Sequence, residues 1–371
     1  MPRFFYLLPF IALCFALTAA KPPEPPDDRA PVEPPRPPIV SAWIQRNRAV
    51  PGPLSAIIAP RITAYHELSP HSYTIERDGS LTTNLPVADA VLVDYARANN
   101  IKLLPSVSSG WNNTPRILNI LRDPQLRAAH IHAIMKIARQ PNIDGIDLNY
   151  ENLPPDAQSA FTEFVTALAD ALHREGKLLS VTVPPKISDN DPCVLCRFAD
   201  YHALGIVADR FRVMAYEYRG KSNGPTALAP IWWLRQLMKY TITQVPRERV
   251  HLAIHLYGYD WGGKETTALW WNEAMALKEK WNGEIRPVAD DARGSVGGYF
   301  LTYAIPVARA RCFRGDPDCA APLLENHTVY FVDAKYVAAA WEIIRDYKLG
   351  GIVFWRPGGE DPAIWDVFKN E

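Results

Sequence analysis

The stretch Asp144–Glu151, which reads DGIDLNYE, constrains this chain more than any other segment. Asp147, Asn149 and Glu151 follow one another at intervals of two residues, so on a β-strand their side chains lie in a row on one face. The segment lies mid-chain, among apolar runs that alternate with helix signals, a context in which strands are usually buried. Buried carboxylates are costly unless they are hydrogen-bonded or share a proton. We therefore predict that this row serves a function.

Apolar, strand-like runs recur from residue 39 to the end of the chain, and helix signals such as Thr114-Pro115, Asp123-Pro124 and Asp333 separate them. We expect strands at Ile39–Trp43, Ile62–Tyr65, Lys102–Val107, Ile143–Glu151, Leu178–Val183, Phe211–Tyr216, His251–Tyr257 and Gly351–Trp355. Eight strands alternating with helices predict an α/β fold of the (β/α)8 TIM-barrel type, over residues 39–371.

Residues 265–332 interrupt this alternation. The Trp-rich segment between Leu269 and Trp281 predicts a helix. Segments that contain several glycines and tyrosines follow it. We expect a small inserted α+β lobe between the seventh strand and the last helix.

The N-terminal residues have the composition of an export signal. Met1–Ala20 carries Arg3, an apolar run and a small-residue cleavage site, which predicts a signal peptide and a secreted, periplasmic or cell-envelope protein. An uncleaved N-terminal anchor is the alternative, and no other stretch predicts a membrane span. Residues 21–38 contain nine prolines and predict an extended linker.

Four cysteines follow the signal segment: Cys193, Cys196, Cys312 and Cys319. In an exported protein they suggest two disulfides, with three possible pairings. Local pairs would each close a short loop, whereas one close and one wide pair are unusual for a four-thiolate zinc site. We expect no metal and no cofactor.

The charges balance, with 40 Lys plus Arg and 40 Asp plus Glu. This balance gives no electrostatic reason to expect nucleic acid or an anionic membrane surface as a partner.

Four motifs, in order along the chain, resemble those of glycoside hydrolase family 18, the chitinase-type hydrolases. The strand-four signature D-G-x-D-x-D-x-E matches Asp144, Gly145, Asp147 and Glu151, with Asn149 where the last aspartate usually stands. The other three are Met214-Ala215-Tyr216-Glu217, the segment Leu252–Gly258 and the segment Gly350–Trp355. Within the family, the chain looks most like the bacterial spore-cortex and cell-wall glucosaminidases.

The resemblance implies a role for each residue of the row. Glu151 is the expected acid, with a pKa raised by burial and by the negative charge of Asp147. In this family the substrate's own acetamide oxygen acts as the nucleophile. Asn149 would hold the acetamide N–H, Tyr216 would hydrogen-bond the acetamide oxygen, and Trp355 would stack under the sugar ring.

Other residues at the expected strand ends extend the candidate site. We expect substrate contacts from Glu217, Tyr257, Asp260, Trp111 and Trp43, although each tryptophan serves packing equally well. Asp144 is expected to be structural.

The predicted function is an exported, monomeric, retaining glycosidase that cleaves β-1,4-linked N-acetylglucosamine glycans of peptidoglycan or chitin type. One alternative is an inactive or weakly active glycan-binding barrel, because Asn149 replaces the usual aspartate. Another is a wall-associated scaffold tethered by the Pro-rich linker.

Overall fold

The computed structural model describes residues 37–46, 52–83, 90–110, 114–289, 296–307 and 323–369. The predicted signal peptide and nearly all of the linker lie outside these residues, and so do Trp111, Cys312 and Cys319. No helix among the described residues is long and apolar enough to cross a membrane.

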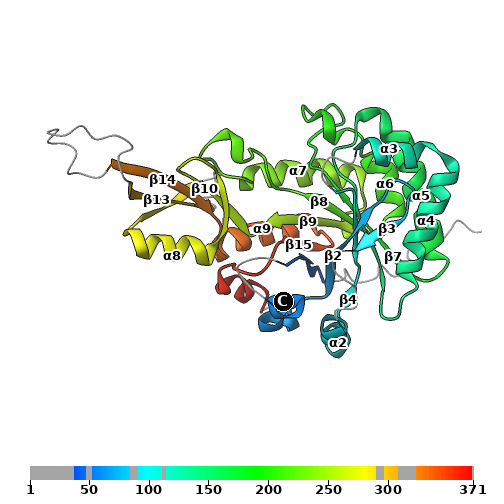
Figure 1. Cartoon of the computed structure of the whole chain (residues 1–371), viewed down its shortest axis with the longest axis horizontal. Helices are drawn as coiled ribbons and strands as arrows, with labels where there is room; N and C mark the ends of the chain where they lie inside the picture. Colours follow the sequence, from blue (N-terminus) through cyan, green and yellow to red (C-terminus); the bar gives the residue numbers. More distant parts are fainter. Residues whose placement is uncertain are drawn as a thin grey trace, which may run out of the picture. The chain divides into compact units, whose positions relative to one another are not determined.

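Parallel strands close into a barrel, as the sequence predicts (Figure 1). Its eight positions are occupied by β1 Ile39–Ile44, β2 Glu67–Ile75, β4 Lys102–Leu103 with β5 Ser106–Ser108, β6 Gly145–Asn149, β7 Leu178–Val183, β8 Arg210–Met214, β9 Val250–His255 and β15 Gly351–Trp355. Strand β1 pairs with both β2 and β15, which closes the barrel. The short strand β3 (Leu81–Thr83) pairs antiparallel with β2.

Helices cover the outside of the barrel, and capping residues begin several of them. The carboxylate of Asp123 accepts from the backbone N–H groups of Gln125 and Leu126 at 2.8 and 3.0 Å, and Asp333 caps the last long helix in the same way. The helices are α1 Leu54–Ile58, α2 Ala90–Ala98, α3 Thr114–Arg122, α4 Pro124–Ala138, α5 Gln158–His173, α6 Tyr201–Val207, α7 Ile231–Gln244 and α9 Ala334–Tyr347.

The inserted lobe follows β9 and precedes α9. It is an antiparallel sheet in the order β11-β10-β14-β13-β12, with α8 (Trp271–Trp281) packed on one face. Its strands are β10 Tyr257–Trp261, β11 Thr267–Trp270, β12 Glu284–Ala289, β13 Val296–Val307 and β14 Leu323–Phe331. The sheet therefore begins at Tyr257, before the predicted start at residue 265, and the seventh barrel strand ends at His255.

Two predicted elements are wrong. Ile62–Tyr65 is not a strand, because most of it belongs to a 3-10 helix that spans Ala59–Ala64, with Pro60 in its first turn. The second strand is instead Glu67–Ile75, a polar segment without an apolar run. In the lobe, Leu269 and Trp270 end strand β11, and the helix begins only at Trp271.

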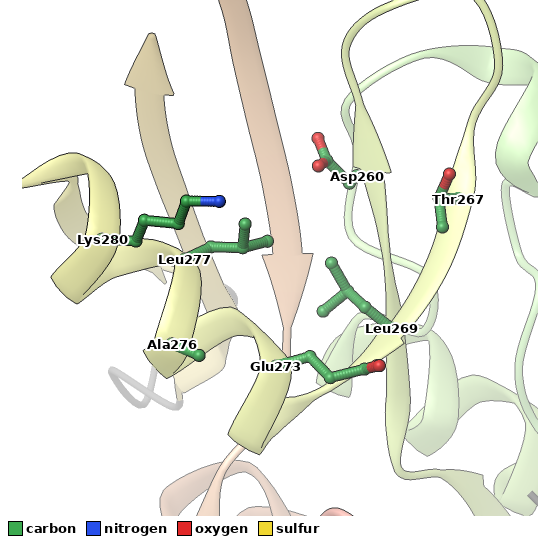
Figure 2. A pocket seen from close by; sticks show the side chains of 7 residues that line it. All are labelled: Asp260, Thr267, Leu269, Glu273, Ala276, Leu277 and Lys280. Atoms are coloured by element: carbon green, nitrogen blue, oxygen red, sulfur yellow. The ribbon is translucent and has the colours of Figure 1, made fainter. Parts of the chain in front are cut away.

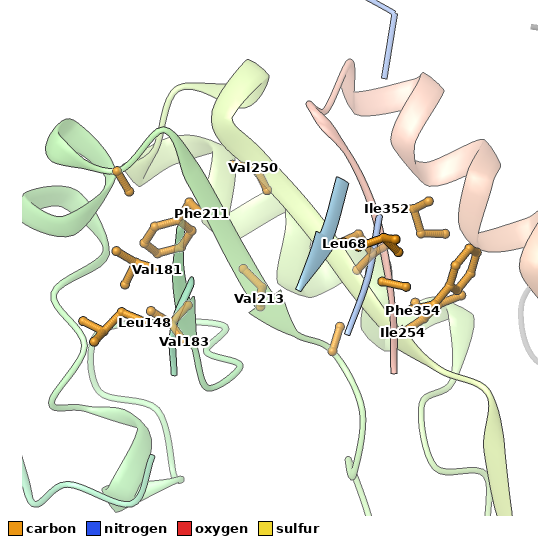
Figure 3. Close-up of a cluster of buried hydrophobic side chains, with 14 of the residues drawn as sticks. Leu68, Leu148, Val181, Val183, Phe211, Val213, Val250, Ile254, Ile352 and Phe354 are labelled. Carbon is orange, nitrogen blue, oxygen red and sulfur yellow. The ribbon is translucent and has the colours of Figure 1, made fainter. Parts of the chain in front are cut away.

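The strands place apolar side chains on the outside of the barrel and polar ones inside. Figure 3 shows part of the outer apolar layer, which includes Leu148, Val181, Phe211 and Ile254, all fully buried. The interior instead carries buried serine, threonine, arginine and acidic side chains. Because its interior face is polar, β2 has no apolar run and was not predicted as a strand.

The first cysteine pair is joined as one of the predicted pairings requires. Cys193 and Cys196 form a disulfide in the loop between β7 and α6, with their Cα atoms 5.3 Å apart.

The glycine of the strand-four motif allows β6 and β7 to approach closely. A Cβ atom at Gly145 would lie 2.2 Å from the backbone oxygen of Leu178, and backbone cannot move aside as a flexible side chain can. Gly145→Ala should therefore lower the free energy of unfolding by about 3 kcal/mol, measured by urea denaturation.

Gly176→Ala is the matched control. Its site is open but has a φ of +67°, so the loss should be about 1–2 kcal/mol from backbone strain alone. Equal losses in the two variants would contradict the steric explanation.

Candidate active site

The carboxylate of Asp147 is the centre of the barrel interior. It is fully buried, and donors from four other strands, β1, β5, β7 and β8, reach its two oxygens. One oxygen (Oδ2) accepts from Trp43 Nε1 and Ser106 Oγ, both at 2.7 Å, and the other (Oδ1) accepts from Ser180 Oγ at 2.6 Å, Thr182 Oγ1 at 3.1 Å and Arg212 Nη1 at 3.1 Å. Hydrogen bonds of this kind stabilise a charge that burial alone would make very unfavourable.

Arg212 provides the compensating positive charge. It is fully buried, donates to Ser69 Oγ at 2.7 Å and lies 3.5 Å from Glu67, which also pairs with Arg210 at 2.6 Å. Burial and the two arginines hold the pKa of His251 well below its usual range. The interior charges therefore alternate in sign and compensate one another.

Asn149 and Glu151 form a second unit, nearer the carboxyl ends of the strands. Asn149 Nδ2 donates to Glu151 Oε1 at 3.0 Å, and the backbone N–H of Glu151 donates to Ser109 Oγ at 3.2 Å. Asn149 is 8% exposed, and its buried Oδ1 has no hydrogen-bond partner among the residues that the structure describes. An unsatisfied buried acceptor at this place suits a ligand that brings an N–H group.

Burial raises the pKa of Glu151 above its ordinary value, and the hydrogen bond from Asn149 partly offsets this by lowering it. The predicted direction of the shift is confirmed. The predicted contribution from the charge of Asp147 is not found, because Asp147 is occupied by Arg212 and four other donors.

Tyr216 follows β8 and lies in the neighbourhood of Glu151. Burial and then the negative charges of Glu151, Glu217 and Asp147 raise its pKa well above its usual range, which places it within electrostatic reach of Glu151. It packs with Trp355, which is partly exposed, in one cluster.

Trp43 belongs to the same cluster but is only 2% exposed, and its indole N–H is bonded to Asp147. Its ring centroid lies 6.3 Å from that of Trp355, edge to face. The predicted direct sugar contact of Trp43 is therefore wrong, because the ring is almost fully buried and its N–H is bonded to Asp147.

The lobe contributes two tyrosines to the mouth of the barrel. Glu217, at a φ of +59°, accepts hydrogen bonds from the hydroxyl groups of Tyr257 and Tyr259. The structure thus brings Glu217 and Tyr257 together, as expected for one site. Tyr259 was not predicted as a site residue, although the spacing of Tyr257, Tyr259 and Trp261 indicates one face of a strand.

Asp260 points to the opposite face of β10. It accepts from Tyr303 at 2.6 Å, lies 2.9 Å from His327, and lines a cavity of about 360 Å³ beneath α8. Figure 2 shows its carboxylate in this cavity, across from Lys280. The predicted substrate contact of Asp260 is wrong, since a strand sends successive side chains to opposite faces.

Asp144 accepts from the backbone N–H of Leu103 at 2.8 Å, which agrees with a structural role. Among the described residues, no three His, Cys, Asp or Glu side chains are grouped in a way that could hold a metal ion.

A family model described as Glycosyl hydrolases family 18 matches residues 62–360. Among curated proteins, the putative sporulation-specific glycosylase YdhD of Bacillus subtilis is 26% identical over 309 residues, covering 81% of this chain and 68% of the relative. The cortical fragment-lytic enzyme of B. subtilis is 26% identical over 315 residues, covering 82% and 67%.

Solved structures share the fold. A chitinase from Chromobacterium violaceum aligns with a TM-score of 0.75 at 22% identity, over 89% of this chain and 98% of that one. The spore cortex-lytic enzyme SleL of Bacillus megaterium aligns with a TM-score of 0.74 at 22% identity, over 89% and 73%.

The interior charge pair yields a prediction about stability. Arg212→Met leaves Asp147 buried without its counter-charge and should lower the free energy of unfolding by about 3–5 kcal/mol in urea denaturation at neutral pH. The double variant Asp147→Asn with Arg212→Met removes both charges and should recover much of this loss. Additive losses in the double variant would show that the two charges are not coupled.

Proposed function

The chain belongs to glycosyl hydrolases family 18, and we propose that it cleaves β-1,4-linked N-acetylglucosamine glycans by substrate-assisted catalysis with retention of configuration. The observation that carries this proposal is the Asn149–Glu151 pair beside Tyr216. It combines an acid with a raised pKa, a phenol, and an amide oxygen that accepts no hydrogen bond from the described part of the chain.

In the first step the carboxylic acid of Glu151 protonates the glycosidic oxygen, and the bond from that oxygen to C1 breaks. The acetamide oxygen of the same sugar attacks C1 and forms a cyclic oxazolinium ion. Asn149 Oδ1 would accept the acetamide N–H, and Tyr216 would donate to the acetamide oxygen, so both orient the internal nucleophile.

In the second step the Glu151 carboxylate takes a proton from water as the water attacks C1. The bond to the acetamide oxygen breaks, the acetamide is regenerated, and the product keeps the original configuration. The configuration is retained because C1 is inverted twice. The proton taken from water returns Glu151 to its acid form.

Asn149 gives this site a property of its own. Its amide donates to Glu151, which favours the carboxylate, and it carries no charge to stabilise the positive intermediate. With Asn149 in this position, we expect a lower catalytic rate and activity confined to acidic pH. The same observation supports the second candidate function, a non-hydrolytic binder of these glycans.

The names of the relatives support a cell-wall substrate. Cortical fragment-lytic enzymes and a sporulation-specific glycosylase are among the similar curated proteins, and the chain spans about two thirds of their length. An exported location is also part of the proposal, supported by the signal-like Met1–Ala20 and by the disulfide between Cys193 and Cys196.

Glu151→Gln should abolish the release of new reducing ends from both chitooligosaccharides and peptidoglycan, because the amide cannot protonate the leaving oxygen. The assay compares the variant with the wild type, and circular dichroism checks that the variant folds. Wild-type protein that binds these glycans without cleaving them would support the binder instead.

Asn149→Asp should raise kcat and move the high-pH limb of the rate profile to higher pH. An aspartate replaces a group that lowers the pKa of Glu151 with a negative charge that raises it, so the acid keeps its proton further up the pH scale. The added charge also stabilises the oxazolinium ion, an effect of up to about 10²–10³ in rate. An unchanged limb and rate would contradict the role given to residue 149.

A further inference from the structure

The disulfide between Cys193 and Cys196 takes no part in the chemistry proposed for Glu151, and its two cysteines differ in exposure. Cys193 is exposed, whereas Cys196 is only 5% exposed. In thiol–disulfide exchange a thiolate attacks one sulfur of the bridge and the other sulfur leaves, so the attacked sulfur must be accessible. The fold therefore presents Cys193 to an attacking thiol and shields Cys196.

The loop around the disulfide is held by hydrogen bonds that do not depend on it. Asp191 is buried, and its carboxylate accepts from the backbone N–H groups of Ile187 and Cys193, both at 2.9 Å. The backbone oxygen of Asp191 accepts from Arg197 Nε at 2.7 Å. In the 3-10 turn that follows, the backbone N–H of Cys196 donates to the oxygen of Cys193 at 3.0 Å. These bonds keep the two cysteines adjacent when the disulfide opens, which favours its re-formation.

The short spacing of the cysteines limits what the disulfide adds to stability. The two residues are three positions apart, so the bridge closes a ring of four residues. In the loop-entropy model such a ring lowers the equilibrium constant of unfolding about 20-fold, against more than about 100-fold for a ring of about 15 residues. Exposed disulfides are also those that exchange most readily. Stability is therefore a weaker reason for this bridge than for one between distant positions.

The residues between the two cysteines are apolar and exposed. Val194 and Leu195 are 51% and 46% exposed, which is unusual for two consecutive aliphatic side chains. Exposed apolar side chains that occur together mark surfaces for binding other proteins. Because a disulfide encloses this pair, the partner that fits it is a protein with two reactive thiols beside an apolar groove.

We propose that the disulfide between Cys193 and Cys196 is a site of reversible thiol–disulfide exchange with a dithiol protein. A thiolate of the partner attacks Cys193 Sγ, the bond from this sulfur to Cys196 Sγ breaks, and Cys196 leaves as a thiolate that takes a proton from water. The second thiolate of the partner then attacks the partner sulfur of the mixed disulfide and releases Cys193, which is protonated in turn. Two electrons pass to the bridge and leave the partner oxidised. The proposal is independent of the proposed function, because no step involves Glu151 or a glycan.

Reduction of the folded wild-type protein is the first test. Trypsin releases the peptide Ile187–Arg197, which contains both cysteines, so alkylation and mass spectrometry follow this disulfide separately from Cys312 and Cys319. Dithiothreitol should reduce it in buffer within about tenfold of the rate in urea, because Cys193 is already exposed in the fold. A disulfide that opens only in unfolded chains would be reduced about 10³–10⁶ times more slowly in buffer, which would overturn the proposal.

A trapping experiment tests the class of partner. A thioredoxin whose second cysteine is replaced by serine cannot complete the exchange, so it should remain attached to Cys193 as a mixed disulfide. Reduced glutathione, which has no apolar groove to contact Val194 and Leu195, should react about tenfold more slowly at the same thiolate concentration. Equal rates for the two thiols, or attachment at Cys196, would overturn the assignment of a dithiol protein attacking Cys193.

Cys196→Ser and Cys193→Ser form a matched pair of variants, each with a single thiol in this loop. Iodoacetamide should label Cys193 in the first variant at least about tenfold faster than Cys196 in the second, because only Cys193 is exposed. Circular dichroism checks that both variants fold, and the wild-type reduction rate tests the proposal without them. Equal labelling, or faster labelling of Cys196, would contradict the choice of Cys193 as the attacked sulfur.

Discussion

The structure depends on a buried carboxylate that is held as a charge. Asp147 receives donors from β1, β5, β7 and β8, so a single side chain on β6 links much of the barrel interior. Burying this charge without a partner would destabilise the fold strongly. Arg212 compensates it, with its Nη1 3.1 Å from Asp147 Oδ1. With its acceptors occupied in this way, Asp147 leaves Asn149 and Glu151 to form a separate pair nearer the mouth.

Two acidic residues four positions apart, Asp147 on β6 and Glu151 just after it, therefore have different tasks. Asp147 organises the interior, whereas Glu151 lies where burial raises its pKa and the amide of Asn149 donates to it. The lobe completes the site by placing Tyr257 and Tyr259 on Glu217, next to Tyr216. The chemistry proposed for Glu151 follows from this separation of the two carboxyl groups.

Spacing along one strand was enough to predict the row of Asp147, Asn149 and Glu151, and strand order was enough to place Tyr216 and Glu217 near it. The partners of Asp147 could not be predicted in this way. Ser180, Thr182 and Arg212 are polar residues within otherwise ordinary strands, and only the curvature of the barrel brings them to one point. Trp43 and Asp260 were misassigned because sequence position does not show which face of a strand meets the mouth.

Most of the barrel was predictable because its outer strand faces are apolar and several of its helices begin at capping aspartates such as Asp123 and Asp333. The second strand was not, since Glu67 and Ser69 face a polar interior and leave no apolar run to detect. A buried strand face is therefore apolar in sequence where it packs against helices, and it can be polar where it faces the barrel interior. Around Asp147, inside this barrel, hydrogen bonds between polar side chains supply much of the packing.

The most direct measurement of the central claim is a carbon NMR titration of the Glu151 carboxyl group in the wild-type protein, assigned by comparison with Glu151→Gln. The account predicts one titration step with its midpoint above the ordinary glutamate value of 4.5. A midpoint at or below that value would mean that Glu151 lacks the proton needed for acid catalysis, and would contradict the mechanism proposed for this site.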